Sequence, residues 1–260
     1  MSTSLEKVKK LRPIDDIFFQ KLIEDIGVCE EILRVILEDK NLQVLSVSPQ
    51  CDQKNLWGRS VRLDALCRLG NGAFCNIEVQ NSSNDDHVRR VRYNAACITS
   101  NNTKVGDRFI QVPDVIMIYI SSFDVFKKGK TIYHCRTVIE ETMEAVDNGL
   151  TEVYVNTVIH DGSNIAELME CFMKEQLDNR KFPLLSKRAW YYKNEESGLK
   201  IMCQIVEEYA EEKILEKTVK NIRSLFENGC SLDVVVASFH DLTEEQIKTI
   251  YLDVKRTENK

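Results

Sequence analysis

The chain has 260 residues, and its 35 Lys and Arg residues against 41 Asp and Glu residues give a formal net charge of −6. Hydrophobic residues make up 43% and charged residues 29%, which are the fractions of a globular protein and exclude disorder over the whole chain. The acidic total argues against a protein that coats nucleic acid indiscriminately, but it leaves room for a local basic patch.

The nine cysteines are scattered, without a CxxC pair, and most lie inside apolar segments such as AFCNIEV. We therefore expect reduced, buried thiols and no zinc site, since zinc needs clustered Cys and His ligands. No apolar run approaches the roughly 20 residues of a membrane helix, and the N-terminus lacks the apolar segment of a signal peptide. These features predict a cytoplasmic protein that does not associate with a membrane.

The predicted elements fall into three groups along the chain. Two short helices, separated at Gly27, are expected over 14–37. A helix at 87–101 then lies among segments with the pattern of strands, at 42–47, 60–70, 73–81, 114–123, 132–141 and 150–159. Helices follow from 163 onward, one long and charged at 207–226 and two short ones within 231–254. This order predicts an α/β core over 1–162 with a helical C-terminal extension over 163–260.

A β-hairpin is expected around the turn Gly70-Asn71-Gly72, and it carries the residues best suited to chemistry. Its two strands run antiparallel, which can bring Asp64 close to Glu78. Gln80 shares the face of Glu78, because side chains of a strand alternate between faces. Apolar strands rarely accept a carboxylate without a partner or a metal. The pair therefore indicates a Mg²⁺ site, with Gln80 beside a bound water; the alternative is a solvated strand face.

Positive charge gathers in the same region. Between Gln53 and Ile110 there are nine basic and five acidic residues, so this window carries 9 − 5 = +4 and the rest of the chain −6 − 4 = −10. Phosphate binding needs only such a local field. The candidates for contacts to a DNA backbone are Arg62, Arg89, Arg90, Arg92 and Tyr93. For the helical residues among them, a solvated helix face is the alternative.

Several blocks of the sequence, in order, resemble the recombination-promoting nuclease/transposase (Rpn) family, which belongs to the PD-(D/E)xK nuclease superfamily. The blocks are RPIDDIFFQKLI, EEILRVILEDKNLQVL, GRSVRLDALCRLGNGAFCNIEVQ, HVRRVRYNAACITSN and VPDVIMIYISSFDVF. The resemblance implies a restriction-endonuclease-like fold, in which helices flank a four-stranded mixed sheet. It also implies Mg²⁺-dependent cleavage of phosphodiester bonds in DNA, with Mn²⁺ as a substitute ion, in recombination or the movement of mobile elements.

Carried over to this chain, the resemblance assigns metal binding to Asp64 and Glu78 and places Gln80 where the superfamily has a catalytic Lys. An acidic residue of the N-terminal helix often completes such a site. Glu31 is the first candidate, with Glu30 and Asp16 behind it. Because Gln80 carries no positive charge, an arginine from the helix at 87–101 is a candidate to supply it.

Two functions remain open at this point. The first is a metal-dependent DNA endonuclease, either monomeric or a homodimer. The second is an inactive nuclease fold retained for binding DNA or protein, which the acidic total and the missing Lys favour. No GxxxxGK[ST] loop is present, so a nucleotide cofactor is not expected.

Overall fold

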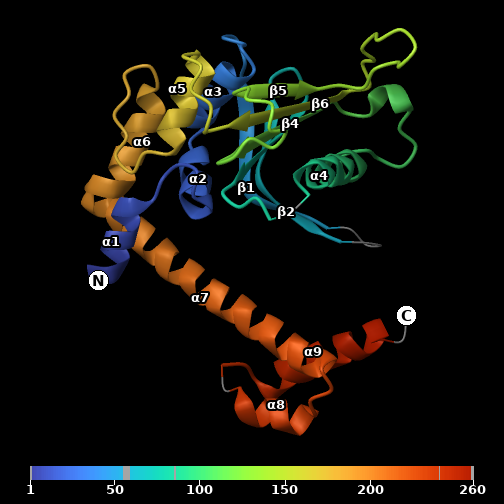
Figure 1. The fold of residues 1–260 in the computed structure, drawn as a ribbon. Helices are drawn as coiled ribbons and strands as arrows, with labels where there is room; N and C mark the ends of the chain where they lie inside the picture. The colour runs from blue at the N-terminus through green and yellow to red at the C-terminus, as the bar shows by residue number, and fades with distance from the viewer. Residues whose placement is uncertain (1, 55–58, 85, 240, 259–260) are drawn as a thin grey trace. The chain divides into compact units, whose positions relative to one another are not determined.

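The computed structural model describes residues 2–54, 59–84, 86–239 and 241–258. Within them the chain forms two compact units, Met1–Met202 and Cys203–Lys260. The first unit holds all the strands of Figure 1 together with the helices that pack on them. The boundary between the two units follows Met202, whereas the sequence pattern changes from strands to helices near residue 162. The two positions differ because α5 and α6 pack against α3 and so belong to the unit that contains the sheet.

The elements of the sheet unit alternate between helices and strands before the chain becomes helical. In chain order they are α1 (Ser2–Lys10), α2 (Asp16–Ile23), α3 (Ile26–Ile36), β1 (Val44–Gln53), β2 (Val61–Leu69), β3 (Phe74–Gln80), α4 (His87–Asn101), the 3₁₀ turn η1 (Phe109–Gln111), β4 (Val115–Ser121), β5 (Ile132–Cys135), β6 (Leu150–Asn156), α5 (Asn164–Phe172) and α6 (Pro183–Asn194). The remaining elements are α7 (Glu196–Glu227), α8 (Leu232–Ser238) and α9 (Glu244–Glu258).

The strands form one mixed sheet in the order β1-β2-β3-β4-β6-β5. Strands β1, β2 and β3 are antiparallel neighbours, β3, β4 and β6 run parallel, and β5 pairs antiparallel with β6. The α/β class with flanking helices and a helical C-terminal region is thus confirmed. The sheet has six strands in the described residues, where the family resemblance implied four.

Helix α4 covers one face of the sheet, and α2 and α3 lie on the other side of it (Figure 1). The core beneath α4 contains Val91, Ala95 and Ile98 from the helix, packed on Met117 and Tyr119 of β4. Because β4 is covered on both faces, its sequence VIMIYIS is apolar almost throughout. Asp86 begins α4 by accepting a hydrogen bond from the backbone N–H of Arg89 (3.0 Å).

The predicted hairpin is present. Gly72 has φ +92°, a left-handed conformation that glycine adopts without steric cost, and its N–H donates to the Leu69 carbonyl (2.9 Å).

The break between α2 and α3 has a different cause from the one that the sequence predicted. Asp25, not Gly27, starts α3, because its carboxylate accepts hydrogen bonds from the N–H groups of Gly27 and Val28.

The C-terminal unit has a small core of its own. It consists of apolar side chains from the end of α7 and from α8 and α9, namely Ile222, Phe226, Val235, Ile247, Ile250 and Val254. No helix in the described part of the chain is long and apolar enough to span a membrane.

Candidate active site

The hairpin brings Asp64 and Glu78 together at the point where the β2–β3 ladder ends. The recorded register runs from Arg68 opposite Phe74 to Ala65 opposite Ile77, so the next position along it places Asp64 beside Glu78. There the Asp64 carboxylate accepts a hydrogen bond from the backbone N–H of Val79 (Oδ2 to N, 2.9 Å). The Asp64 side chain thus accepts a hydrogen bond from a backbone N–H of β3 that would otherwise pair with a backbone carbonyl of a neighbouring strand.

The backbone of β1 is distorted opposite Asp64. Pro49 pairs with Ala65 and Cys51 with Leu63, but Gln50 between them has φ +49°, in the left-handed region. Left-handed backbone is unfavourable for a side chain such as Gln and is found most often where the surrounding structure imposes it, frequently at functional sites. The Gln50 amide donates to the Gln20 carbonyl oxygen on α2, which ties this bend to the helix beside the site.

Glu78 is only 2% exposed, and three side chains hold its carboxylate. The amides of Asn76 and Asn94 both donate to Oε1, at 2.9 and 3.3 Å. The Arg90 guanidinium lies 3.6 Å from the other oxygen, Oε2. Oε1 is therefore anchored by amides from β3 and α4, and Oε2 faces a positive charge on α4.

The acidic pair titrates abnormally. Burial raises the pKa of Asp64 well above its ordinary value, and the negative charges of Glu78 and Asp16 raise it further. Burial also raises the pKa of Glu78, against the opposing effects of the Asn76 amide and the Arg90 guanidinium. Buried carboxylates with raised pKa values in one cluster are candidates for a functional site.

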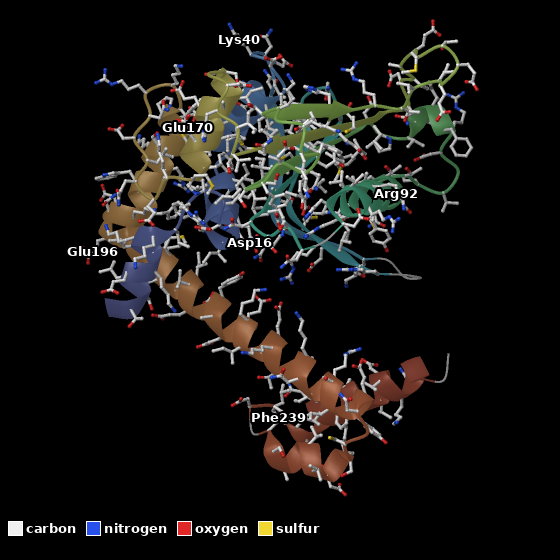
Figure 2. The ribbon with its side chains drawn as sticks, viewed as in Figure 1. Asp16, Lys40, Arg92, Glu170, Glu196 and Phe239 are labelled. Atoms are coloured by element: carbon white, nitrogen blue, oxygen red, sulfur yellow. The ribbon has the colours of Figure 1, made fainter. Side chains whose placement is uncertain are left out.

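Asp16 is the N-terminal acid that the structure brings to this pair. It is the first residue of α2, and Gln20 donates a hydrogen bond to its Oδ1 (3.0 Å). Its charge acts on both Asp64 and Glu78, as the pKa directions show. In Figure 2, Asp16 on α2 and Arg92 on α4 flank the strands of the hairpin from two sides.

Glu31 and Glu30, which the sequence offered ahead of Asp16, contact other elements in the structure. The Glu31 carboxylate accepts from the backbone N–H groups of Leu184 and Leu185 at the start of α6 (3.1 and 2.8 Å). Glu30 accepts from the Val44 N–H (2.9 Å) and also bonds Arg34. Both acids thus hold elements of the fold together.

Gln80 and Arg90 form a linked pair next to Glu78. The Arg90 Nη1 donates to the Gln80 Oε1 (3.1 Å), while the Gln80 amide nitrogen donates to the Ser82 carbonyl (3.0 Å). Gln80, which the resemblance aligns with a Lys, thus holds through its side-chain carbonyl a guanidinium supplied by the neighbouring helix.

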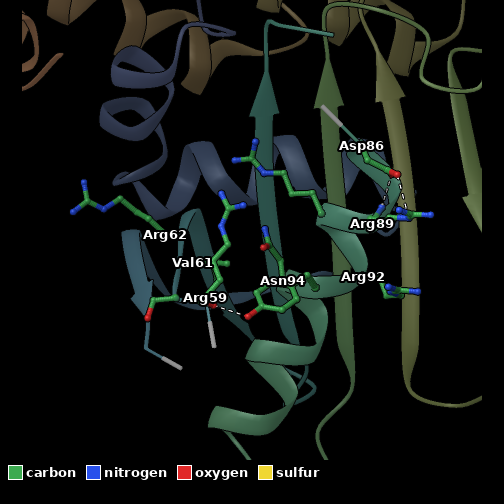
Figure 3. A pocket seen from close by; sticks show the side chains of 10 residues that line it. Arg59, Val61, Arg62, Asp86, Arg89, Arg92 and Asn94 are labelled. Carbon is green, nitrogen blue, oxygen red and sulfur yellow. Dashed lines mark hydrogen bonds and ion pairs between the residues drawn. The ribbon is translucent and has the colours of Figure 1, made fainter. Parts of the chain in front are cut away.

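A pocket of about 420 Å³ opens between the start of β2 and the first turns of α4. All five predicted backbone-binding residues line it, namely Arg62, Arg89, Arg90, Arg92 and Tyr93, together with Arg59 and Asn94. Figure 3 shows Arg62 on the strand side of the pocket and Arg89 and Arg92 on the helix side. Ion pairs with Asp52 and Asp86 partly neutralise Arg62 and Arg89. Arg59, whose carbonyl accepts from the Tyr93 hydroxyl (2.6 Å), is the arginine of the pocket lining that the sequence-based set lacks.

The donor set fits a hard divalent cation. In residues 2–54, 59–84, 86–239 and 241–258, no three His, Cys, Asp or Glu side chains form a ready-made metal cluster. Asp64 and Glu78 nevertheless supply oxygen ligands of the kind Mg²⁺ prefers, and Mg²⁺ commonly uses one or two carboxylates and keeps several waters. Burial raises the pKa of both carboxyl groups, and a bound cation would oppose this by favouring their ionised forms.

Comparison with known proteins identifies a family for part of the chain. Residues 25–162 match the family described as PD-(D/E)XK nuclease family transposase, and that range contains the hairpin, α4 and the pocket. No curated protein and no solved structure matches the chain significantly.

Proposed function

The chain belongs to the PD-(D/E)XK nuclease family transposase group, since the match covers more than half of its length; from this premise we propose that it is a Mg²⁺-dependent DNA endonuclease. The observation that carries the proposal is the contact of Glu78, the partner of Asp64 in the acidic pair, with Arg90 and Asn94, two residues that line the arginine-rich pocket. We assign its cleavage of phosphodiester bonds to recombination or the movement of mobile elements.

Asp64 and Glu78 would hold the metal ion, with Asp16 as the third acid near them. When bound, Mg²⁺ supplies polarisation of the phosphoryl oxygen and a lowered pKa of a coordinated water, and Mn²⁺ is expected to substitute. Asn76 and Asn94 hold the Oε1 of Glu78, so they fix the direction in which Oε2 is presented.

Arg90 would supply the positive charge that the family's Lys provides. Its guanidinium is linked to both Gln80 and Glu78, so it lies where negative charge would develop on the phosphate. Gln80 positions Arg90 through its carbonyl oxygen and would orient the attacking water. The remaining arginines of the pocket would grip the DNA backbone, which needs no base contacts.

The test is nicking of supercoiled plasmid by the full chain in Mg²⁺, Mn²⁺ or EDTA, with the Asp64→Asn and Asp39→Asn variants compared. Asp39 is exposed and, like Asp64, accepts a backbone hydrogen bond (from the Asn41 N–H, 2.9 Å), so it is a matched acid-to-amide control. We expect metal-dependent nicking by the wild type and by Asp39→Asn, and none by Asp64→Asn. Nicking that survives in Asp64→Asn at wild-type rate would contradict the assignment.

The second candidate is an inactive nuclease fold that binds DNA or protein. Gln80 at the Lys position and the net charge of −6 favour it. DNA binding without nicking under any divalent metal, with no shift of the melting temperature on adding Mg²⁺, would support this alternative over the nuclease.

A further inference from the structure

The loop between β4 and β5, residues 122–131, lies next to the candidate active site. Its first residue, Ser122, donates its N–H to the carbonyl of Gln80 (3.0 Å). Its far end is tied to β6, where the Asn156 amide donates to the Lys130 carbonyl (2.7 Å). Because β3, β4 and β6 run parallel, their carboxyl ends share one edge of the sheet, and the loop occupies the edge that carries Gln80.

A single carboxylate organises the loop. Asp124 accepts hydrogen bonds from the N–H groups of Phe126, Lys127 and Gly129 (3.1, 2.9 and 2.8 Å) and from the Tyr133 hydroxyl (2.7 Å). The same Tyr133 oxygen accepts from two further N–H groups of the loop, at 3.2 and 3.1 Å. The Asp124 carboxylate is therefore used for contacts within the loop and with Tyr133, and these contacts fix the shape of the loop.

The organised loop presents three exposed lysines, Lys127, Lys128 and Lys130. Among the described residues, lysines such as Lys21, Lys181 and Lys213 form ion pairs, whereas no ion pair is recorded for the three lysines of the loop. Two of the pocket arginines, by contrast, pair with aspartates. The loop thus presents less compensated positive charge than the pocket does.

The loop and the arginine pocket meet the same helix. Phe123 of the loop packs against His87, the first residue of α4, with ring centroids 4.8 Å apart and the rings tilted by 46°. Arg89, Arg90 and Arg92 on the next turns of α4 line the pocket. Strands β4 and β6 lie about 5 and 10 Å from β3 at ordinary strand spacing. The loop and the acidic pair therefore lie at the same edge of the sheet, within one to two strand spacings of each other along it.

We infer that loop 122–131 is a second contact for DNA phosphates, which holds the duplex on the β4–β6 side of the bond to be cut. This inference rests on the proposed nuclease function and adds to it the direction in which the substrate extends. Lysines suit this task because each is a strongly hydrated point charge that contacts phosphates without reading sequence.

The test compares two triple variants of the full chain with the same change in charge. One is Lys127→Ala/Lys128→Ala/Lys130→Ala in the loop. The control replaces three exposed lysines elsewhere in the sheet unit, Lys40→Ala/Lys174→Ala/Lys200→Ala. Binding to a fluorescent 30-base-pair duplex is measured in EDTA between 50 and 200 mM salt, so that no cleavage interferes.

Three lost phosphate contacts should reduce the slope of log affinity against log salt by about 3 × 0.9, or 2.7. Over a fourfold change in salt, the affinity of the wild type should then fall about 40-fold more than that of the loop variant. The Lys→Arg triple variant should keep the wild-type slope, because it keeps the charges. In plasmid nicking, the loop variant should raise KM and leave kcat unchanged, since these contacts are made equally in the ground and transition states.

An unchanged salt slope and KM in the loop variant, with normal nicking by the wild type, would overturn the inference and leave the nuclease proposal standing. Equal losses in both triple variants would also overturn it, since they would report net charge alone. Loss of binding to phosphatidylserine vesicles with unchanged DNA binding would overturn it in favour of a membrane contact. A wild type that binds DNA but never nicks it would instead contradict the nuclease proposal.

Discussion

Replacing Asp64 with Asn should abolish metal-dependent nicking and, at the same time, make the protein more stable at neutral pH without metal. The Asn side chain keeps an oxygen that can accept the hydrogen bond from the Val79 N–H, so the local structure is retained. What disappears is a negative charge that burial and the neighbouring acids disfavour. Replacement of a functional residue that destabilises the fold commonly lowers activity and raises the free energy of unfolding.

The size of the effect follows from the ordinary cost of such charges. Removing one destabilising charge is commonly worth about 1–2 kcal/mol, and each kcal/mol raises the melting temperature of a unit of about 200 residues by roughly 2–4 °C. We therefore expect Asp64→Asn to melt about 2–8 °C above the wild type at pH 7 in EDTA. The Asp39→Asn control should melt with the wild type.

The pH dependence has a definite sign. Because the folded state raises the pKa of Asp64, the folded protein binds this proton more tightly than the unfolded chain does. The wild type should therefore lose stability relative to Asp64→Asn as the pH rises from about 4, the ordinary Asp pKa, toward neutrality. Below pH 4 the two proteins should melt together.

Magnesium should reverse the order of stability. At hundredfold excess over the dissociation constant, a bound ion adds about 2.7 kcal/mol to the wild type, which exceeds the roughly 1–2 kcal/mol cost of the buried charge, and Asp64→Asn should gain much less. Differential scanning fluorimetry from pH 4 to 8, with EDTA or MgCl₂, measures all of these effects. Equal melting temperatures of wild type and Asp64→Asn at pH 7, with equal responses to Mg²⁺, would refute the reasoning that places an uncompensated acid at the metal site.

Three further predictions separate the roles of the neighbouring residues. Arg90→Ala should lower the single-turnover nicking rate by about 10²–10³, and Arg90→Lys should recover part of it. Arg89→Ala removes a side chain that is 79% exposed and should act mainly on KM. Equal effects of the two Ala variants on the rate would contradict the role of Arg90. Asn94→Ala should weaken Mg²⁺ binding about 10–100-fold in both nicking and thermal-shift titrations by releasing the Oε1 of Glu78, and an unchanged Mg²⁺ midpoint would exclude this positioning role. Asp16→Asn should impair Mg²⁺-dependent nicking while the melting temperature stays unchanged or rises. Glu31→Gln should leave nicking intact and lower the melting temperature, because it weakens the contact of Glu31 with the N–H groups at the start of α6. The reverse pattern would place Glu31, and not Asp16, at the site.

The parts of the fold that local sequence determines were predictable. The Gly70-Asn71-Gly72 turn with alternating flanks predicted the hairpin, and α4 follows its apolar spacing from His87 to Asn101. Strand β1 was expected to end at Val47 but continues to Gln53, because pairing with β2 and not the propensity of β1 extends it. Helix α1 carries no comparable pattern and was missed; its one fully buried apolar side chain is Val8.

The choice among the N-terminal acids could not be made from sequence. Glu31, Glu30 and Asp16 all lie on short helices that precede the hairpin, and each is a reasonable partner for a metal site. Which of them faces the hairpin depends on contacts with distant elements. Glu31 is drawn to α6, more than 150 residues along the chain, and Glu30 to β1. The lysine loop was also missed, because only the parallel pairing of β3 with β4 places residues 122–131 beside Gln80.

The exchange of Lys for the Gln80–Arg90 pair has a chemical consequence. A lysine in a buried site can lose its proton near neutral pH and act as a base, whereas a guanidinium stays charged at every pH at which the protein is folded. Arg90 can therefore stabilise negative charge on a phosphate but cannot take a proton from the attacking water. Gln80 has no titratable group at all. If the chain cleaves DNA, the pH dependence of the reaction must come from the carboxylates or from the metal-bound water, and Arg90→Lys should add a second ionisation to the pH–rate profile. A profile that is unchanged in shape in Arg90→Lys would show that the residue at position 90 does not contact the reacting phosphate.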